Sequence, residues 1–183
     1  MRNPMKPSHT TGKSPRSTRG RWNAIIAVVV VYVVARLGWL ANVSPPADLH
    51  EGDVAVVRVV DGDTLVLDHN VRVRLIGVNC PESVKPDTPV EPFGLEASNY
   101  TKREVAKVGD RVRLQFDRER YDIHGRTLAF VWLGDRMLNE ELLREGLARW
   151  EPHFNYASAM KTRFRKAESE ARDARRGVWS KGK

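Results

Sequence analysis

The sequence predicts an α+β fold: a small five-stranded β-barrel with three helices, preceded by one N-terminal transmembrane helix. Short segments with alternating apolar residues and Asp- or Asn-containing turns follow residue 53, and one helical pattern interrupts them. An unbroken apolar run lies near the N-terminus. We place a basic tail at residues 1–22, the membrane segment at 23–43, a linker at 44–52 and the folded domain at 53–183.

The domain begins as a β-meander, because its first strand signals are joined by Asp61-Gly62-Asp63 and Asp68-His69-Asn70. Strands are expected at residues 54–60, 64–68, 71–78, 111–116 and 127–133. Helices are expected at residues 94–108, 138–145 and 157–176, where apolar residues recur at helical spacing. Five short strands with a helix inserted after the third match a Greek-key barrel of OB type better than a sandwich or a parallel sheet.

The positive charge of the chain is concentrated at its N-terminus. Residues 1–43 contain seven Lys and Arg and no Asp or Glu, whereas the other 140 residues carry 24 basic and 23 acidic side chains. Any nucleic acid must therefore be held by local basic clusters of the domain. A single cysteine, Cys80, excludes an intramolecular disulfide and a zinc site built from cysteines.

The N-terminal apolar run can span a membrane only if it extends beyond its uninterrupted part. Residues 24–35 would form a helix about 18 Å long, and extension to residue 43 gives about 30 Å, the thickness of a hydrocarbon core. The basic flank before the run predicts that the domain lies on the non-cytoplasmic side. The alternative is a signal peptide cleaved after Val33-Val34-Ala35, which would release a secreted domain.

Six segments occur in one order across residues 54–180: VVDGDTLVL, VRLIGVNCPE, GLEASNYTK, YDIHGRTLAFVW, LNEELLREGLAR and RGVW. In order and spacing they resemble the staphylococcal nuclease (thermonuclease) family. The resemblance implies an OB barrel that depends on Ca²⁺ and hydrolyses DNA and RNA without a covalent intermediate. We further expect the substrate to be preferably single-stranded and the protein to be a monomer.

The resemblance also assigns roles to individual residues. The metal would be bound by Asp63, Asn79 and the backbone carbonyl of Cys80, the phosphate by Arg74 and Arg126, and the attacking water by Glu82. These residue types suit the reaction, because a phosphodiester gains negative charge on attack, and guanidinium groups and a hard cation offset that charge. We expect Glu82 to orient the water more than to remove its proton.

The sequence departs from the family at Asn79, where most members have Asp, and at Cys80, where Thr is common. Asparagine keeps a carbonyl ligand but removes a formal charge, so calcium should bind more weakly by about one to three decades. The base-stacking tyrosines are also altered. Phe154 is the best candidate for a stacking residue, followed by Tyr156 and His124.

Two questions remain open at this level. Arg74 and Asn79 are an odd number of residues apart, so a strand end or bulge near Gly77 must turn one of them if both serve one site.

The alternative to an enzyme is an inactive nuclease-like OB module that binds single-stranded nucleic acid or a protein partner. Asn79 favours that module, whereas the joint presence of Asp63, Arg74, Glu82 and Arg126 opposes it.

Overall fold

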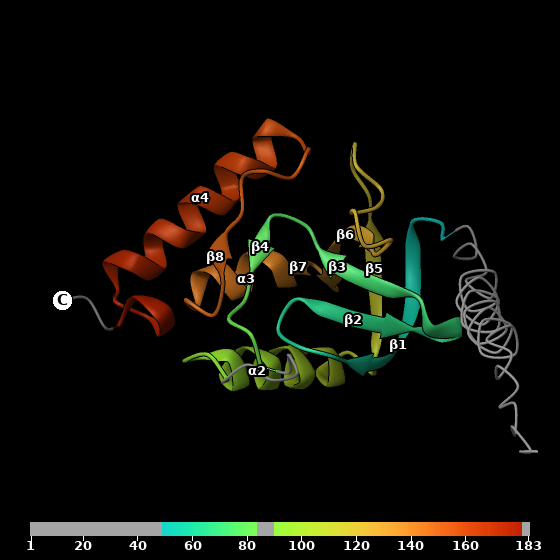
Figure 1. Cartoon of the computed structure of the whole chain (residues 1–183), viewed down its shortest axis with the longest axis horizontal. Helices are drawn as coiled ribbons and strands as arrows, with labels where there is room; N and C mark the ends of the chain where they lie inside the picture. Colours follow the sequence, from blue (N-terminus) through green and yellow to red (C-terminus); the bar gives the residue numbers. More distant parts are fainter. Residues whose placement is uncertain (1–48, 84–89, 181–183) are drawn as a thin grey trace, which may run out of the picture. The chain divides into compact units, whose positions relative to one another are not determined.

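The computed structural model describes residues 49–83 and 90–180 (Figure 1). The predicted basic tail, the membrane segment 23–43 and most of the linker lie outside these residues. Within the described ranges, no helix combines the length and the apolar character that crossing a membrane requires.

Five strands close into the predicted barrel. They are β1 (Gly52–Val59), β2 (Thr64–Leu67), β3 (Arg72–Leu75), β5 (Arg111–Gln115) and β6 (Thr127–Leu133). Antiparallel pairs join β3, β2, β1, β5 and β6 in that order, and a parallel pair between β3 and β6 closes the ring. A register shift in β1 between Val56 and Arg58 bends this strand, so that its first half pairs with β5 and its second half with β2.

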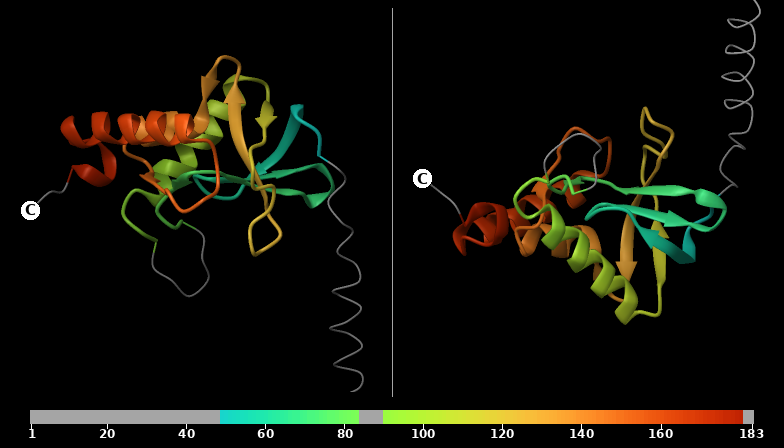
Figure 2. Two further views of the ribbon diagram at one scale, coloured as in Figure 1. Left: turned by 90° about the horizontal axis from the view of Figure 1, so that it is seen from above. Right: turned by 60° about the horizontal axis from the view of Figure 1, so that its bottom comes forward.

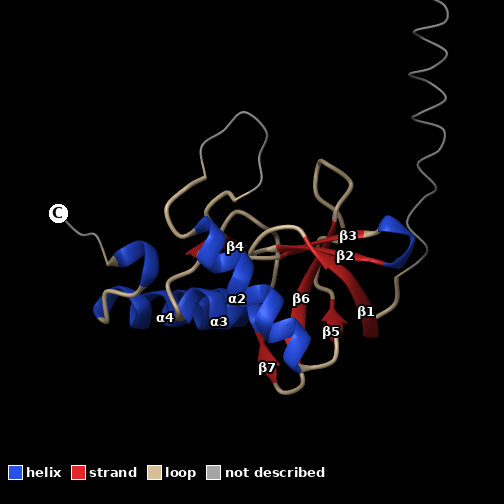
Figure 3. Cartoon of the chain, turned by 90° about the horizontal axis from the view of Figure 1, so that it is seen from below, coloured by secondary structure: helices blue, strands red, loops and turns tan. Residues whose placement is uncertain are grey.

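Three helices accompany the barrel, as predicted: α2 (Gly94–Lys107), α3 (Leu138–Arg144) and α4 (Ser158–Asp173). α2 runs along the barrel against β1 and β5, whereas α3 and α4 pack on each other to one side of the strands (Figures 2 and 3). The narrow apolar stripe of α4 is buried, and Phe164 on it makes an edge-to-face contact with Phe130 of β6 at 5.8 Å.

The third predicted strand, residues 71–78, is divided in two. β3 ends at Leu75, and a turn with Gly77 at φ +77° leads into β4 (Val78–Asn79), which pairs with β8 (Arg149–Trp150). A Cβ atom at Gly77 would lie 2.7 Å from the Tyr156 hydroxyl, so both the conformation and the space require glycine.

The sequence did not predict β4 and β8 as a separate ribbon, nor β7 (Arg136–Met137), which pairs with the end of β6. Strands of two residues are too short to show the alternation by which strands are predicted. A 3-10 turn, η1 (Asp68–Asn70), connects β2 and β3.

The described chain ends in a second 3-10 turn, η2 (Gly177–Trp179), which is fastened to the end of α3. The Val178 N–H donates to the Gly146 carbonyl at 2.9 Å. The two backbones approach so closely that a Cβ atom at Gly177 would lie 2.1 Å from the Gly146 oxygen.

Asn139 at the start of α3 ties the turn after β3 to the barrel, although its side chain is fully buried. Its Oδ1 accepts a hydrogen bond from the Val131 N–H at 2.9 Å, and its Nδ2 donates to the Ile76 carbonyl at 2.9 Å and the Ala129 carbonyl at 3.4 Å. One amide therefore satisfies backbone groups from β6 and from the turn that precedes β4.

The Asn139→Ala substitution should lower the free energy of unfolding by about 2–4 kcal/mol, because it leaves buried backbone donors and acceptors without partners. Urea denaturation followed by circular dichroism measures this loss. Asn99→Ala, on the exposed face of α2, is the matched control and should change stability little. Equal stabilities of the two variants would contradict the role given to Asn139.

Candidate active site

A buried ion pair between Asp63 and Arg74 forms the centre of the candidate site. Asp63 ends the turn between β1 and β2, and Arg74 lies on β3, directly opposite Thr64 of β2. The Arg74 Nε lies 3.2 Å from Asp63 Oδ1, and only 7% and 8% of the two side chains are exposed. Neither charge would be stable at this depth without the other.

The Arg74 guanidinium also reaches the residue predicted as the second metal ligand. Its Nη2 donates to Asn79 Oδ1 at 3.4 Å, and its Nη1 donates to the Leu75 carbonyl at 2.5 Å. The turn at Gly77 makes this contact possible, because it ends β3 and brings Asn79 to the side that Arg74 occupies. The expected strand end near Gly77 is confirmed.

The Asp63 carboxylate accepts hydrogen bonds from several donors, yet its pKa is raised. Its Oδ2 accepts from the Cys80 N–H at 2.7 Å, and its Oδ1 accepts from the Thr64 hydroxyl at 3.1 Å. Burial, opposed by Arg74 and reinforced by the Asp61 carboxylate, raises the pKa of Asp63 to about 6. The charged form of Asp63 is therefore disfavoured mainly because the carboxylate is removed from water.

Asp61 was not among the predicted site residues. Its Oδ1 accepts a hydrogen bond from the Asp63 N–H at 3.0 Å, so it shapes the turn and adds its charge to the centre. The signal was present in the sequence, since a second carboxylate stands two residues before Asp63 in the same Asp-Gly-Asp turn.

The donor atoms at this centre fit a hard cation such as Ca²⁺, which prefers carboxylate, amide and carbonyl oxygens. Asp63 would supply a carboxylate, the exposed Asn79 an amide oxygen, and Cys80 a backbone carbonyl. Burial and repulsion by Asp61 disfavour the charged form of Asp63, and a bound cation would offset both costs by its positive charge. Within the described ranges, no group of three or more His, Cys, Asp or Glu side chains is arranged to hold a metal ion, so a cation here would also need amide, carbonyl or water oxygens.

The Cys80 side chain packs under the turn that carries Asp63. A Cβ atom at Gly62 would lie 2.6 Å from the Cys80 sulfur. Burial, together with the negative charge of Asp63, raises the pKa of the Cys80 thiol well above its usual range. The thiol therefore stays protonated and is a weak nucleophile.

Arg126, the second predicted phosphate-binding arginine, lies on the hairpin between β5 and β6 and is oriented by Asp122. Its Nε lies 2.6 Å from Asp122 Oδ2, while Asp122 Oδ1 accepts the backbone N–H groups of His124 and Arg126, each at 2.9 Å. Burial raises the pKa of Asp122, but these hydrogen bonds outweigh it and hold the pKa below its usual range. One carboxylate thus fixes both the turn and the guanidinium.

Sequence reasoning did not identify Asp122 as a site residue. An Asp three residues before Gly125 is a common way to cap a tight turn, and this local pattern was the available signal. His124 lies exposed on the same hairpin.

The two aromatic residues proposed for base stacking have different environments. The Phe154 ring lies 5.8 Å from the Arg74 guanidinium carbon and reaches the centre. It borders a cavity of about 340 Å³ whose other lining residues are Arg74, Glu119, Glu151 and His153. Phe154 is therefore placed where a base next to a bound phosphate could stack.

Tyr156 is a core residue, and its prediction as a base-stacking residue is corrected. Its side chain is only 2% exposed, and its ring packs edge-on against Phe130 at 5.9 Å. The Trp150 indole donates to its hydroxyl at 2.9 Å. A ring enclosed in this way has no face open to a base.

Glu82 lies on the loop after β4, and its backbone is held by the segment that leads into α2. Its N–H donates to Glu91 Oε2 at 3.1 Å, and its carbonyl accepts from the Glu91 N–H at 2.9 Å. The Glu82 carboxylate accepts from the Ser83 N–H at 3.0 Å. Glu91 therefore positions the backbone of Glu82.

Comparison with known proteins identifies the family of this chain. Residues 72–181 match the family model described as staphylococcal nuclease homologue. The chain belongs to the staphylococcal nuclease family. It is 38% identical to a thermonuclease of Staphylococcus hyicus over 167 residues, which cover 85% of this chain and 95% of that protein. It is 45% identical to a thermonuclease of Staphylococcus intermedius over 140 residues, covering 73% and 80%, respectively. Endonuclease YncB of Bacillus subtilis is 37% identical over 137 residues, covering 70% of this chain and 62% of the other.

In this nuclease-family domain, Asp122→Ala should lower the free energy of unfolding by about 1–2 kcal/mol at pH 7, because two backbone N–H groups of the hairpin and the partly buried Arg126 guanidinium lose their common acceptor. Since the folded-state pKa of Asp122 is lowered, its contribution is present above the unfolded value of about 3.9 and is lost as the pH falls through the lower folded value. The difference from wild type should therefore shrink in acid.

Urea denaturation at a series of pH values tests this prediction. Asp135→Ala, at an exposed position in the turn between β6 and β7, removes the same charge elsewhere and should cost little at any pH. A stability difference for Asp122→Ala that grows toward low pH would contradict the assigned direction.

Proposed function

We propose that this chain is a calcium-dependent nuclease that hydrolyses phosphodiester bonds of DNA and RNA, preferably single-stranded, on the non-cytoplasmic side of a membrane. That it is a hydrolase acting on phosphodiester bonds follows from its family and from relatives named thermonuclease and endonuclease. One observation supports the proposed chemistry most directly: the Arg74 guanidinium contacts both Asp63 and Asn79. The guanidinium proposed to bind phosphate is thus next to the carboxylate and the amide oxygen proposed to bind calcium.

The chain's own residues can bind and orient a phosphodiester. Arg74 is held by the Leu75 carbonyl and Asn79 and still has N–H donors beyond those that these contacts use. Arg126, held by Asp122, offers the second guanidinium. Planar donors fixed before the substrate arrives stabilise the charge that develops on the phosphate without reorganising during the reaction.

Asp63, Asn79 and the Cys80 carbonyl would hold the calcium ion, which supplies positive charge to a phosphate oxygen and activates water when bound. Glu82 would orient the attacking water, and its backbone contacts with Glu91 keep it on a fixed loop. Phe154 would stack on a neighbouring base.

Location and assembly are part of the proposal and rest on the sequence. The predicted membrane segment at residues 23–43 and its basic flank support a membrane anchor with the domain outside the cytoplasm, and a cleaved signal would instead give a secreted enzyme. We propose that the enzyme acts as a monomer.

The rival candidate is an inactive module of the same fold that only binds nucleic acid or a protein. Asn79 favours it, because the amide brings no charge to the metal site. Turnover separates the two candidates, since a binding module has none to lose.

Arg126→Lys and Arg74→Lys should each lower the single-turnover cleavage rate of a labelled single-stranded oligonucleotide by about two or more decades. Lysine keeps the charge but lacks the planar pair of donors, so equilibrium binding at fixed salt should change much less. Arg165→Lys, on the exposed face of α4, is the matched control. Wild-type protein that binds but never cleaves at millimolar calcium would establish the rival function.

Asn79→Asp should tighten calcium binding by about one to three decades, because it restores a charged ligand. Isothermal titration with calcium alone measures the affinity without relying on activity, and a chelator should abolish cleavage. Asn70→Asp adds the same charge on the exposed η1 turn and serves as the control. If Asn79→Asp and wild type bind calcium equally, Asn79 is not a ligand.

A further inference from the structure

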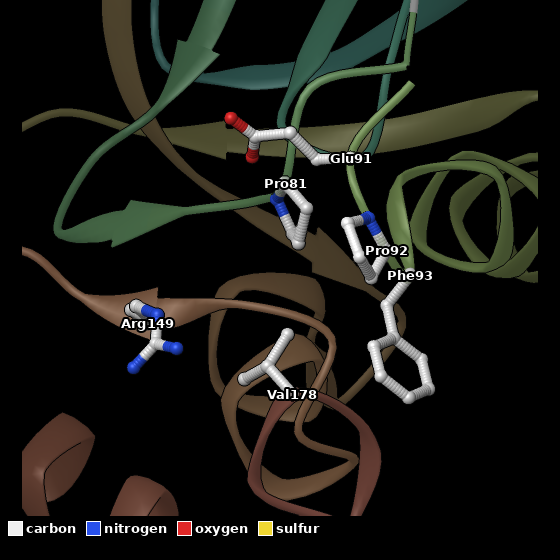
Figure 4. Close-up of a pocket in the computed structure, with 6 residues that line it drawn as sticks. All are labelled: Pro81, Glu91, Pro92, Phe93, Arg149 and Val178. Atoms are coloured by element: carbon white, nitrogen blue, oxygen red, sulfur yellow. The ribbon is translucent and has the colours of Figure 1, made fainter. Parts of the chain in front are cut away.

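A second cavity lies near the catalytic centre and contains none of the residues considered so far as substrate contacts. Its volume is about 310 Å³, near the lower end of the usual range for small-molecule sites, which is about 300–1,000 Å³. The lining residues are Pro81, Glu91, Pro92, Phe93, Arg149 and Val178 (Figure 4). Among the described residues, this cavity shares no lining residue with the cavity beside Phe154.

The β4–β8 ribbon links the second cavity to the catalytic centre through one residue pair. Arg149 on β8 is paired with Asn79 on β4, and side chains of such directly opposed residues lie on one face with Cβ atoms about 5 Å apart. Asn79 contacts Arg74, and Arg74 borders the Phe154 cavity. The contact between Arg74 and Asn79 thus connects a residue that borders the Phe154 cavity with the strand partner of a residue that borders the second cavity.

The lining is suited to a flat ring with polar edges. Pro81, Pro92, Phe93 and Val178 supply apolar surface, and Figure 4 shows them around the opening with Glu91 and Arg149 at its margins. Carboxylate and guanidinium groups can bind the edges of a base, and Arg149 also attracts the phosphate chain.

Arg149 is fixed before any ligand binds. Its guanidinium lies over the Trp179 ring at 4.3 Å, and Arg172 lies over the same ring at 4.1 Å. The next residue of β8 is also held, because the Trp150 N–H donates to the Glu168 carboxylate at 2.8 Å. A cation on a fixed strand is a preorganised contact for an anionic chain.

Phe93 gives an independent indication that this cavity has a function. It precedes α2 in a left-handed conformation, with φ 71° and ψ 3°, and provides no side-chain cap for the helix. Such a conformation costs about 1–3 kcal/mol for a large residue and persists where the surroundings enforce it, often at binding sites. Here it directs an aromatic ring to the cavity (Figure 4).

The segment that enforces this conformation is the one that holds Glu82. Gly94 is packed so closely that a Cβ atom would lie 2.5 Å from the Glu82 carbonyl oxygen, and its N–H donates to the Glu91 carbonyl at 2.9 Å. Glu91, in turn, binds the Glu82 backbone. The wall of the cavity and the residue assigned to the attacking water thus form one hydrogen-bonded unit.

We propose that this cavity is a second nucleoside subsite, which holds the base on the side of the scissile phosphate opposite to Phe154. The inference rests on the proposed nuclease function and extends it to the substrate, a strand with a base on each side of the cleaved bond. A base bound between Phe93 and the two prolines draws the strand across the centre and supports the loop of Glu82. Binding energy from this remote base then contributes to turnover.

The test uses the full chain in detergent and single-stranded oligonucleotides with one cleavable phosphodiester, all other linkages being methylphosphonates. An abasic nucleotide is placed on one side of the cleavable bond, then on the other. With wild-type protein, each replacement should lower kcat/KM by roughly tenfold to a hundredfold, because stacking of the missing base is lost. Phe93→Asn tolerates the left-handed backbone and removes the ring, so it should abolish the penalty on one side only.

Phe93→Tyr keeps the ring and should preserve both penalties, and Leu95→Asn, an exposed apolar position on α2, is the matched control. Equal cleavage by Phe93→Asn and wild type, or an abasic penalty on only one side in wild type, would overturn the second subsite. Hydrolysis of bis(p-nitrophenyl) phosphate, which has no bases, tests the catalytic centre separately. If wild type hydrolyses neither this diester nor any oligonucleotide, the proposed function itself fails.

Discussion

Two opposite charges inside the barrel wall, Asp63 and Arg74, constrain much of the surrounding structure. Removing either one would leave the other buried without a counter-charge, which is among the most destabilising changes a core can undergo. The neighbouring groups supply the remaining partners: the Cys80 N–H and the Thr64 hydroxyl for the carboxylate, and the Leu75 carbonyl for the guanidinium. The chemistry of the site and the closure of the barrel thus depend on the same contacts.

Much of the barrel could be predicted because its strands and helices are long enough to show a period. Residues 127–133 form β6 as expected, and α2 and α3 end within one residue of their predicted limits. The β4–β8 ribbon could not be predicted in this way, since two residues carry no period and their partners are about seventy residues apart. The second cavity depends on that pairing, so its residues did not stand out in the sequence.

Several of the predicted site residues lie together in the structure, whereas the environments of others depend on loop packing. Asp63, Arg74 and Asn79 do come together, with Cys80 next to Asp63. Phe154 was ranked ahead of Tyr156 as a stacking residue, but the sequence did not show that the Tyr156 ring faces the core, because the packing of the loop before α4 decides this. Asp122 was missed because its effect is indirect: it holds Arg126.

Because η2 is hydrogen-bonded to Gly146, cleavage before this turn and addition of residues after it should have different effects on the domain. Val178, which borders the second cavity, and Trp179, which supports Arg149, both belong to this last turn. Arg175 and Arg176 directly precede it and are natural targets for trypsin-like proteases. Trimming at either position would open the cavity while leaving the barrel closed, whereas a fusion partner attached after Ser180 would leave the turn in place.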